Sequence, residues 1–174
     1  MKKALYLSLF LGVISIVAAI ILSLTNNLTE ETIKNANIAK QNKQLASIFT
    51  DKTKFTKETK NYSDFPTIES IYIAKEDDKV LGYVYSVITK GYAGKIRYFV
   101  AIDPNGKYIS FNSIEHGETP GFGTKMDESK FRDQFAKKTI EDDIDGLSGA
   151  TITTNALFKG FDEVIEHFEK NYKK

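Results

Sequence analysis

The residue pattern with the clearest chemistry is Asp-Gly-Leu-Ser-Gly-Ala-Thr at positions 145–151. An acidic turn leads to Thr151, and a segment with helical apolar periodicity begins directly afterwards. The first turn of a helix carries unpaired N–H groups and the positive end of the helix dipole, which together bind phosphate. The pattern therefore predicts a hydroxyl group beside a phosphate-binding helix end.

Two alternatives apply to this pattern. Ser-Gly-Ala-Thr also suits a plain helix cap, because threonine is a common N-cap residue and glycine is common in turns. Thr153 and Thr154 lie within the expected first helical turn and are rival hydroxyl groups. The acidic run Glu141–Gly146 has the acidic spacing with which an EF-hand calcium loop starts. Counted from Glu141, however, the twelfth position is Ile152, where such a loop needs a bidentate glutamate.

The elements that would position this turn belong to an α+β domain. Alternating apolar residues predict strands over 68–75, 80–88, 95–102 and 107–114, and the second pair is joined by the hairpin turn Asp103–Gly106. Helices are expected over 127–138 and 152–172, the latter buried through Ala156, Leu157, Phe161, Val164, Ile165 and Phe168. The result is a twisted antiparallel sheet packed by helices.

The N-terminal segment differs from the rest of the chain. Ala4–Leu24 contains no charged residue, and at about 1.5 Å per residue it is long enough to cross a hydrocarbon core of about 30 Å. Lys2 and Lys3 precede it, so the positive-inside rule places the N-terminus in the cytoplasm and the main domain outside. A cleaved signal peptide is the alternative, although the apolar run is longer than usual and no clean cleavage site follows.

We therefore divide the chain into three parts: residues 1–24 as a cytoplasmic N-terminus and membrane anchor, 25–66 as a juxtamembrane helix and linker, and 67–174 as the main domain. Within the second part, residues 25–50 are expected to form a polar helix and 51–66 a loop.

Composition narrows the chemistry further. The chain has no cysteine, which excludes thiolate-held iron–sulfur clusters, and its histidines are only His116 and His167. No metal site is predicted. The formal net charge of +1 does not indicate a nucleic-acid-binding surface. Because thiols are absent and imidazoles are few, any redox chemistry must come from an organic cofactor or from a partner. No Ser/His/Asp order for a hydrolase is present either.

Two motifs give the chain a family resemblance. Residues 145–151 match the flavinylation pattern Asp-x-x-Ser/Thr-Gly-Ala-Thr, and Glu118–Gly123 match a Glu-Thr-Pro-Gly-Leu-Gly element about 30 residues upstream, with Phe122 in place of leucine. Residues 90–96 look like the glycine-rich loop of the same family. With the apolar N-terminus, these features resemble the G subunits of Rnf electron-transport complexes; the C subunits of sodium-pumping NADH–quinone reductases are close relatives.

The resemblance implies a covalent flavin. Flavin mononucleotide (FMN) would be joined through its phosphate to Thr151, with Ser148 as a turn or phosphate ligand and Gly149 and Ala150 supplying room. A separate flavin transferase would attach it, and Asp145 would help that enzyme to recognise the chain.

The upstream element would then form a wall of the flavin site. Gly121 and Gly123 would let backbone N–H groups approach the ring, Thr119 would offer a hydroxyl, and Phe122 would offer a flat face. Glu118 would either position the loop or touch the flavin. A plain Pro/Gly turn is the alternative interpretation of this element, and Tyr92 could border the ring.

The implied function is electron transfer without a catalytic residue of its own. The chain would be an electron-carrying subunit of a membrane ion-translocating ferredoxin–NAD oxidoreductase. Its partners would be the other membrane and peripheral subunits, including a second flavin-bearing membrane subunit, together with the lipid bilayer. The alternatives are a membrane-anchored extracytoplasmic flavoprotein of another electron-transfer or sensor system, or the C subunit of the quinone reductase.

Overall fold

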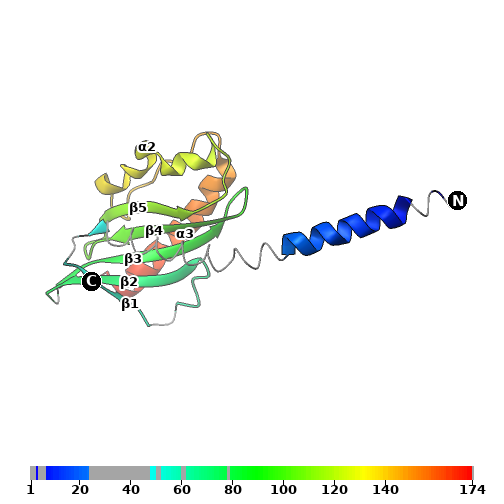
Figure 1. Cartoon of the computed structure of the whole chain (residues 1–174). Coiled ribbons are helices and arrows are strands. Elements are labelled where there is room, and N and C mark those ends of the chain that lie inside the picture. The colour runs from blue at the N-terminus through cyan, green and yellow to red at the C-terminus, as the bar shows by residue number, and fades with distance from the viewer. Residues whose placement is uncertain are drawn as a thin grey trace. The chain divides into compact units, whose positions relative to one another are not determined.

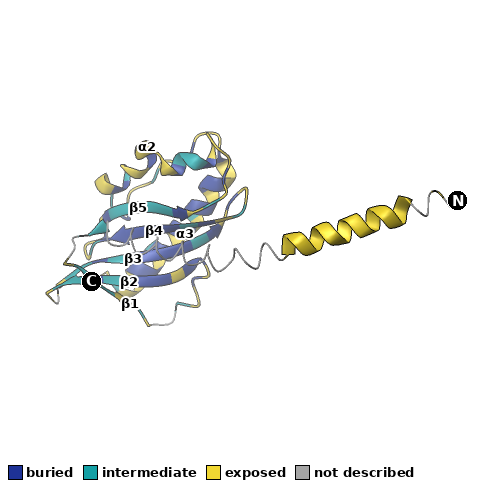
Figure 2. Ribbon diagram, viewed as in Figure 1, coloured by how far each residue is buried: buried dark blue, intermediate teal, exposed yellow. Residues whose placement is uncertain are grey.

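The computed structural model describes residues 3, 7–23, 48–49, 52–59, 62–77 and 79–173. Its contacts divide the chain into two units, Met1–Lys40 and Gln41–Lys174. In the first unit, residues 7–23 form a helix whose side chains are exposed (Figure 2). Among the described residues, no helix has both the length and the apolar character needed to cross a membrane. The predicted helix over 25–50 lies outside the described residues except for 48–49.

The second unit is built on a five-stranded antiparallel sheet in the order β1-β2-β3-β4-β5 (Figure 1). The strands are β1 Lys54–Lys57, β2 Ile68–Glu76, β3 Lys79–Lys90, β4 Lys95–Ile102 and β5 Tyr108–Glu115. The four predicted strands correspond to β2 through β5, and the α+β class is confirmed. The prediction of a loop over 51–66 was wrong at β1, an edge strand whose mostly exposed side chains leave no apolar alternation to detect.

The sheet buries side chains on both faces. Along β4, alternate residues point in opposite directions. One set enters the main core with α3 (Thr151–Asn171), and the other joins a smaller cluster on the opposite face. The first set is Ile96, Tyr98, Val100 and Ile102; the second is Phe99 and Ala101, together with Val84 of β3 and Ile114 of β5.

Helix α3 packs against β2 and β3 and agrees with the predicted helix over 152–172. Its predicted buried face is confirmed except at Ile165, which is half-buried. His167 is buried with its Nδ1 3.1 Å from the hydroxyl of Tyr85. Burial also raises the pKa of the Tyr85 and Tyr98 hydroxyl groups, so both stay neutral in the core.

The prediction of a single helix over 127–138 was wrong. The chain there forms three short pieces: η1 (Gly123–Asp127), α2 (Ser129–Arg132) and η2 (Phe135–Lys137). Phe131 and Phe135 are both buried, as their spacing suggests, and contact Phe111 of β5. The run is interrupted at Glu128, whose backbone is extended (φ −71°, ψ 144°). After η2 the backbone turns to pair with the start of β5, where Tyr108 N–H donates to the Lys138 carbonyl at 3.1 Å.

Gly160 sets how closely α3 approaches the sheet. A Cβ at this position would overlap the hydroxyl oxygen of Tyr98 and lie 2.8 Å from Cγ1 of Val87. The Tyr98 hydroxyl itself donates to the Leu157 carbonyl at 3.2 Å, so it is not free to move aside. The glycine is therefore required by packing.

We expect Gly160→Ala to lower the free energy of unfolding by about 1–3 kcal/mol, because the overlap outweighs the helix propensity gained. Urea unfolding measures this change. Gly117→Ala is the matched control: a Cβ there meets only the Ala93 carbonyl oxygen at 3.9 Å, so its effect should stay within about 0.5 kcal/mol. Equal stability of the two variants would show that α3 adapts to the extra methyl group.

Candidate functional site

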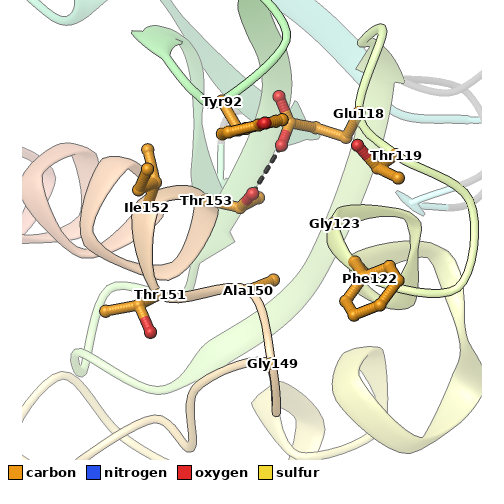
Figure 3. A pocket seen from close by; sticks show the side chains of 10 residues that line it. All are labelled: Tyr92, Glu118, Thr119, Phe122, Gly123, Gly149, Ala150, Thr151, Ile152 and Thr153. Atoms are coloured by element: carbon orange, nitrogen blue, oxygen red, sulfur yellow. Dashed lines mark hydrogen bonds between the residues drawn. The ribbon is translucent and has the colours of Figure 1, made fainter.

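A cavity of about 410 Å³ lies at the N-terminal end of α3 (Figure 3). Three segments that are distant in sequence form its walls. They are the loop after β3, the turn that follows β5, and the first residues of α3 with the turn before them. The lining residues are Tyr92, Glu118, Thr119, Phe122, Gly123, Gly149, Ala150, Thr151, Ile152 and Thr153.

The turn before α3 has the backbone that the sequence suggests. Gly149 has φ +80°, in the left-handed region that favours glycine. Ala150 is the N-cap residue, and no side chain caps the helix. The first internal helix bond runs from Thr154 N–H to the Ala150 carbonyl at 2.9 Å. Earlier amide groups have no partner within a helix, so the cavity wall includes N–H donors at the positive end of the α3 dipole.

The three threonines at the start of α3 lie in different surroundings. Thr153 is buried, and its hydroxyl donates to Oε2 of Glu118. Thr154 is also buried, and its Oγ1 accepts from Leu147 N–H at 2.9 Å. Thr151 is exposed, and Figure 3 shows its hydroxyl pointing away from the Thr153–Glu118 bond. Of these three hydroxyl groups, only that of Thr151 is accessible.

Glu118 connects all three walls of the cavity. It is 4% exposed, and Oε1 accepts from Ala93 N–H at 2.9 Å while Oε2 accepts from Thr153. Both glycines beside it are required by its position. A Cβ at Gly91 would lie 2.6 Å from Oε1, and one at Gly123 would lie 2.6 Å from Cβ of Glu118. The carboxylate therefore holds the glycine loop, the turn after β5 and the first turn of α3 together.

The cavity wall exposes large apolar side chains. Among the described residues of the second unit, the exposed large apolar side chains are Tyr92 at 68%, Phe122 at 52% and Ile152 at 56%. All three line this cavity. A concentration of exposed apolar surface at one concave place is typical of a binding site. The cavity therefore suits a flat apolar ligand that also carries an anionic group for the helix end.

The structure brings together seven of the ten residues predicted for the site, and Tyr92 with them: Glu118, Thr119, Phe122, Gly123, Gly149, Ala150 and Thr151. Gly121 lies outside the lining, with φ +76° and its N–H donated to Oγ1 of Thr124 at 2.9 Å. Asp145 and Ser148 line a neighbouring groove of about 200 Å³. The Asp145 side chain is 89% exposed and 3.9 Å from Nζ of Lys138.

Sequence reasoning missed two contributors to the site. Ile152 was interpreted only as the start of a helix, yet its side chain is exposed on the cavity wall. Lys125 donates from Nζ to the Ser148 carbonyl at 2.7 Å, and its Nζ lies 5.8 Å from the centroid of the Phe122 ring. No local pattern could reveal this contact, since 23 residues separate the two partners in sequence.

Removing the Glu118 carboxylate should destabilise the domain. Glu118→Ala leaves Ala93 N–H and the Thr153 hydroxyl without their acceptor, at a cost of about 2–4 kcal/mol in the free energy of unfolding. Glu118→Gln keeps one acceptor oxygen and should cost about half as much. Urea unfolding is the measurement, with the exposed Glu166→Ala as control. An Ala variant as stable as this control would show that the carboxylate does not hold the walls.

Comparison with known proteins identifies the domain that contains the cavity. A family model described as "FMN-binding domain" matches residues 91–166, which include the cavity walls. The chain is 32% identical over 161 residues to the G subunit of the proton-translocating ferredoxin:NAD(+) oxidoreductase complex of Clostridium ljungdahlii, covering 86% of this chain and 83% of that protein. It is 28% identical to the Na(+)-translocating counterpart of Acetobacterium woodii, over 97% and 93% of the two chains.

The fold also has a solved counterpart. The crystal structure of NqrC from Shewanella oneidensis matches with a TM-score of 0.50 and 21% identity, over 70% of this chain and 68% of that one. This similarity concerns the fold alone. The sequence matches extend over most of both chains and carry the assignment: the protein belongs to the family of G subunits of Rnf-type ion-translocating oxidoreductase complexes and contains an FMN-binding domain.

Proposed function

We propose that this protein carries electrons within an Rnf-type complex on an FMN attached through its phosphate to Thr151. The observation that carries the proposal is the accessible Thr151 hydroxyl, at an uncapped helix end beside three exposed apolar side chains. The names of the relatives, subunits of ferredoxin:NAD(+) oxidoreductase complexes, support the electron-transfer role.

The cavity fits a flavin in size and chemistry. Its volume of about 410 Å³ lies within the usual range for small-molecule sites. Phe122, Ile152 and Tyr92 would contact the ring, and the free N–H groups at the start of α3 would hold the phosphate. The bound flavin would supply the redox chemistry, since it exchanges one or two electrons.

Each protein residue has a positioning role in this proposal. Thr151 would fix the phosphate end, and Thr119, which lines the cavity, would offer its hydroxyl group to the ring. Phe122 takes the place of the leucine of the family element and lies near Gly149, where an added Cβ would be 3.4 Å from its ring. Glu118 acts indirectly, by holding the cavity walls together, because both of its oxygens already accept hydrogen bonds from the protein. No general acid or base is needed for electron transfer.

Attachment of the flavin would fall to a separate transferase. The described site offers no base beside Thr151 to activate its hydroxyl, since the nearest carboxylate in the cavity, Glu118, is bonded to Thr153 and Ala93. Asp145 and Ser148 face outward in the neighbouring groove. We assign Asp145, as the exposed charge, to recognition by the transferase, and Ser148 to the turn. The new bond would join Oγ of Thr151 to phosphorus, with net loss of one water relative to free FMN.

We expect Thr151→Val to abolish covalent flavin without unfolding the domain, because the residue is exposed. Each variant is expressed with an active flavin transferase, and its intact mass and in-gel flavin fluorescence are measured. Ser129→Ala is the control: it removes an exposed hydroxyl outside the cavity and should keep the added mass. Covalent fluorescence that persists in Thr151→Val would refute Thr151 as the acceptor.

Membrane attachment and partners form the second part of the proposal. We propose that Ala4–Leu24 anchors the protein, with its N-terminus cytoplasmic and its main domain extracytoplasmic, on the basis of the uncharged sequence and the preceding lysines. The exposed edge of the flavin site would then face the other subunits of the complex, one of which carries its own flavin. Its relatives include subunits of both proton- and sodium-translocating complexes.

The absence of cysteine makes this topology directly measurable. We expect a single cysteine introduced as Lys170→Cys to react with a membrane-impermeant maleimide on intact spheroplasts. A cysteine introduced as Lys3→Cys should react only after lysis. Both positions are exposed, so accessibility on the protein itself is matched. The reverse labelling pattern, or equal labelling of both without lysis, would contradict the proposed orientation.

A further inference from the structure

Lys125 connects the two turns that form the flavin site. It belongs to η1, directly after the turn that carries Phe122, and its N–H donates to the Phe122 carbonyl at 3.2 Å. Its side chain reaches the other turn, where Nζ donates to the Ser148 carbonyl at 2.7 Å. The residue thus joins the wall with the aromatic face to the turn that leads to Thr151.

The hydrogen bond from Lys125 to Ser148 lies where the backbone sets the direction of Thr151. The Ser148 carbonyl belongs to the peptide unit just before Gly149, whose φ of +80° directs the chain toward Ala150 and Thr151. Gly149 also lies against the Phe122 ring. A hydrogen bond that fixes this peptide unit therefore helps to fix the direction of the acceptor residue.

The ammonium group also brings a positive charge to the site. Nζ lies 5.8 Å from the centroid of the Phe122 ring, the proposed contact face for the flavin. Lys125 is half-buried, so water screens its charge only in part. A positive charge near the ring favours the flavin form that has gained an electron.

We propose that Lys125 is a positioning residue of the flavin site: its hydrogen bond holds the turn that carries Thr151, and its charge raises the reduction potential of the bound flavin. The effect on the reduction potential rests on the proposed function, because it needs a bound flavin. The first effect is a property of the protein chain and is measurable without flavin.

Three substitutions separate the two effects. Lys125→Met removes both the donor and the charge. Lys125→Gln keeps an N–H donor without the charge, and Lys125→Arg keeps both. Lys130→Met is the matched control, because Lys130 lines the same groove as Ser148 and is exposed, without a hydrogen bond to it.

The first measurement is amide hydrogen exchange over residues 147–151 in the full chain, purified without flavin from a host that lacks the transferase. We expect Lys125→Met to speed exchange about fivefold to tenfold, the effect of losing one hydrogen bond. Lys125→Arg and the Lys130 control should match the wild type, and Lys125→Gln should lie close to it. Unchanged exchange in Lys125→Met would overturn the positioning role.

The second measurement is the reduction potential of the flavin in chains expressed with the transferase. We expect Lys125→Met and Lys125→Gln to lower the equilibrium constant for adding one electron by about threefold to tenfold, where tenfold corresponds to about 59 mV. Lys125→Arg should retain the wild-type potential. Equal potentials in Lys125→Met and the wild type would overturn the electrostatic role, even if stability changed.

Failure of the proposed function gives a different result. If the wild-type protein acquires no flavin mass, the proposed attachment to Thr151 is refuted. The exchange measurement would still decide whether Lys125 holds the turn. Flavin mapped to another residue would likewise refute Thr151 while leaving both Lys125 measurements meaningful.

Discussion

The candidate site depends on one buried carboxylate. Glu118 accepts from the Ala93 amide on one side and from the Thr153 hydroxyl on the other, and so joins segments from three parts of the chain. A buried carboxylate is costly unless it is fully hydrogen-bonded, and here the geometry of both neighbouring turns satisfies it. The bond also withdraws Thr153 from solvent. The same interaction therefore shapes the cavity and leaves Thr151 as the accessible hydroxyl among the three threonines at the start of α3.

Core packing supports this arrangement. Helix α3 starts at the cavity and continues as a long buried element against β2 and β3, where Gly160 allows close contact with Tyr98. Most of the helix is fixed by core residues such as Leu157 and Val164. Its first turn is thus held by packing that is remote from the site, which is the usual way in which a fold keeps functional groups in place.

Much of this fold could be predicted from the sequence because its signals are local. Alternation defined β2 to β5, and apolar periodicity defined α3. The two motifs located seven cavity residues, although ligand contact by those residues stays a prediction. The missed features depend on tertiary contacts. β1 has little apolar pattern, the chain breaks its helical run to pair with β5, and the Lys125 contact spans distant segments.

Alanine at the N-cap of α3 has a consequence for maturation. Alanine is among the poorest capping residues, since it offers no side-chain acceptor to the first amide groups. On the proposed attachment to Thr151, the phosphate oxygens would accept from those amides and act as the missing cap. The helix end would then be most prone to fraying before modification, when the modifying enzyme must gain access to it. Afterwards the cofactor would lock its own attachment point, so that loading and local folding are coupled.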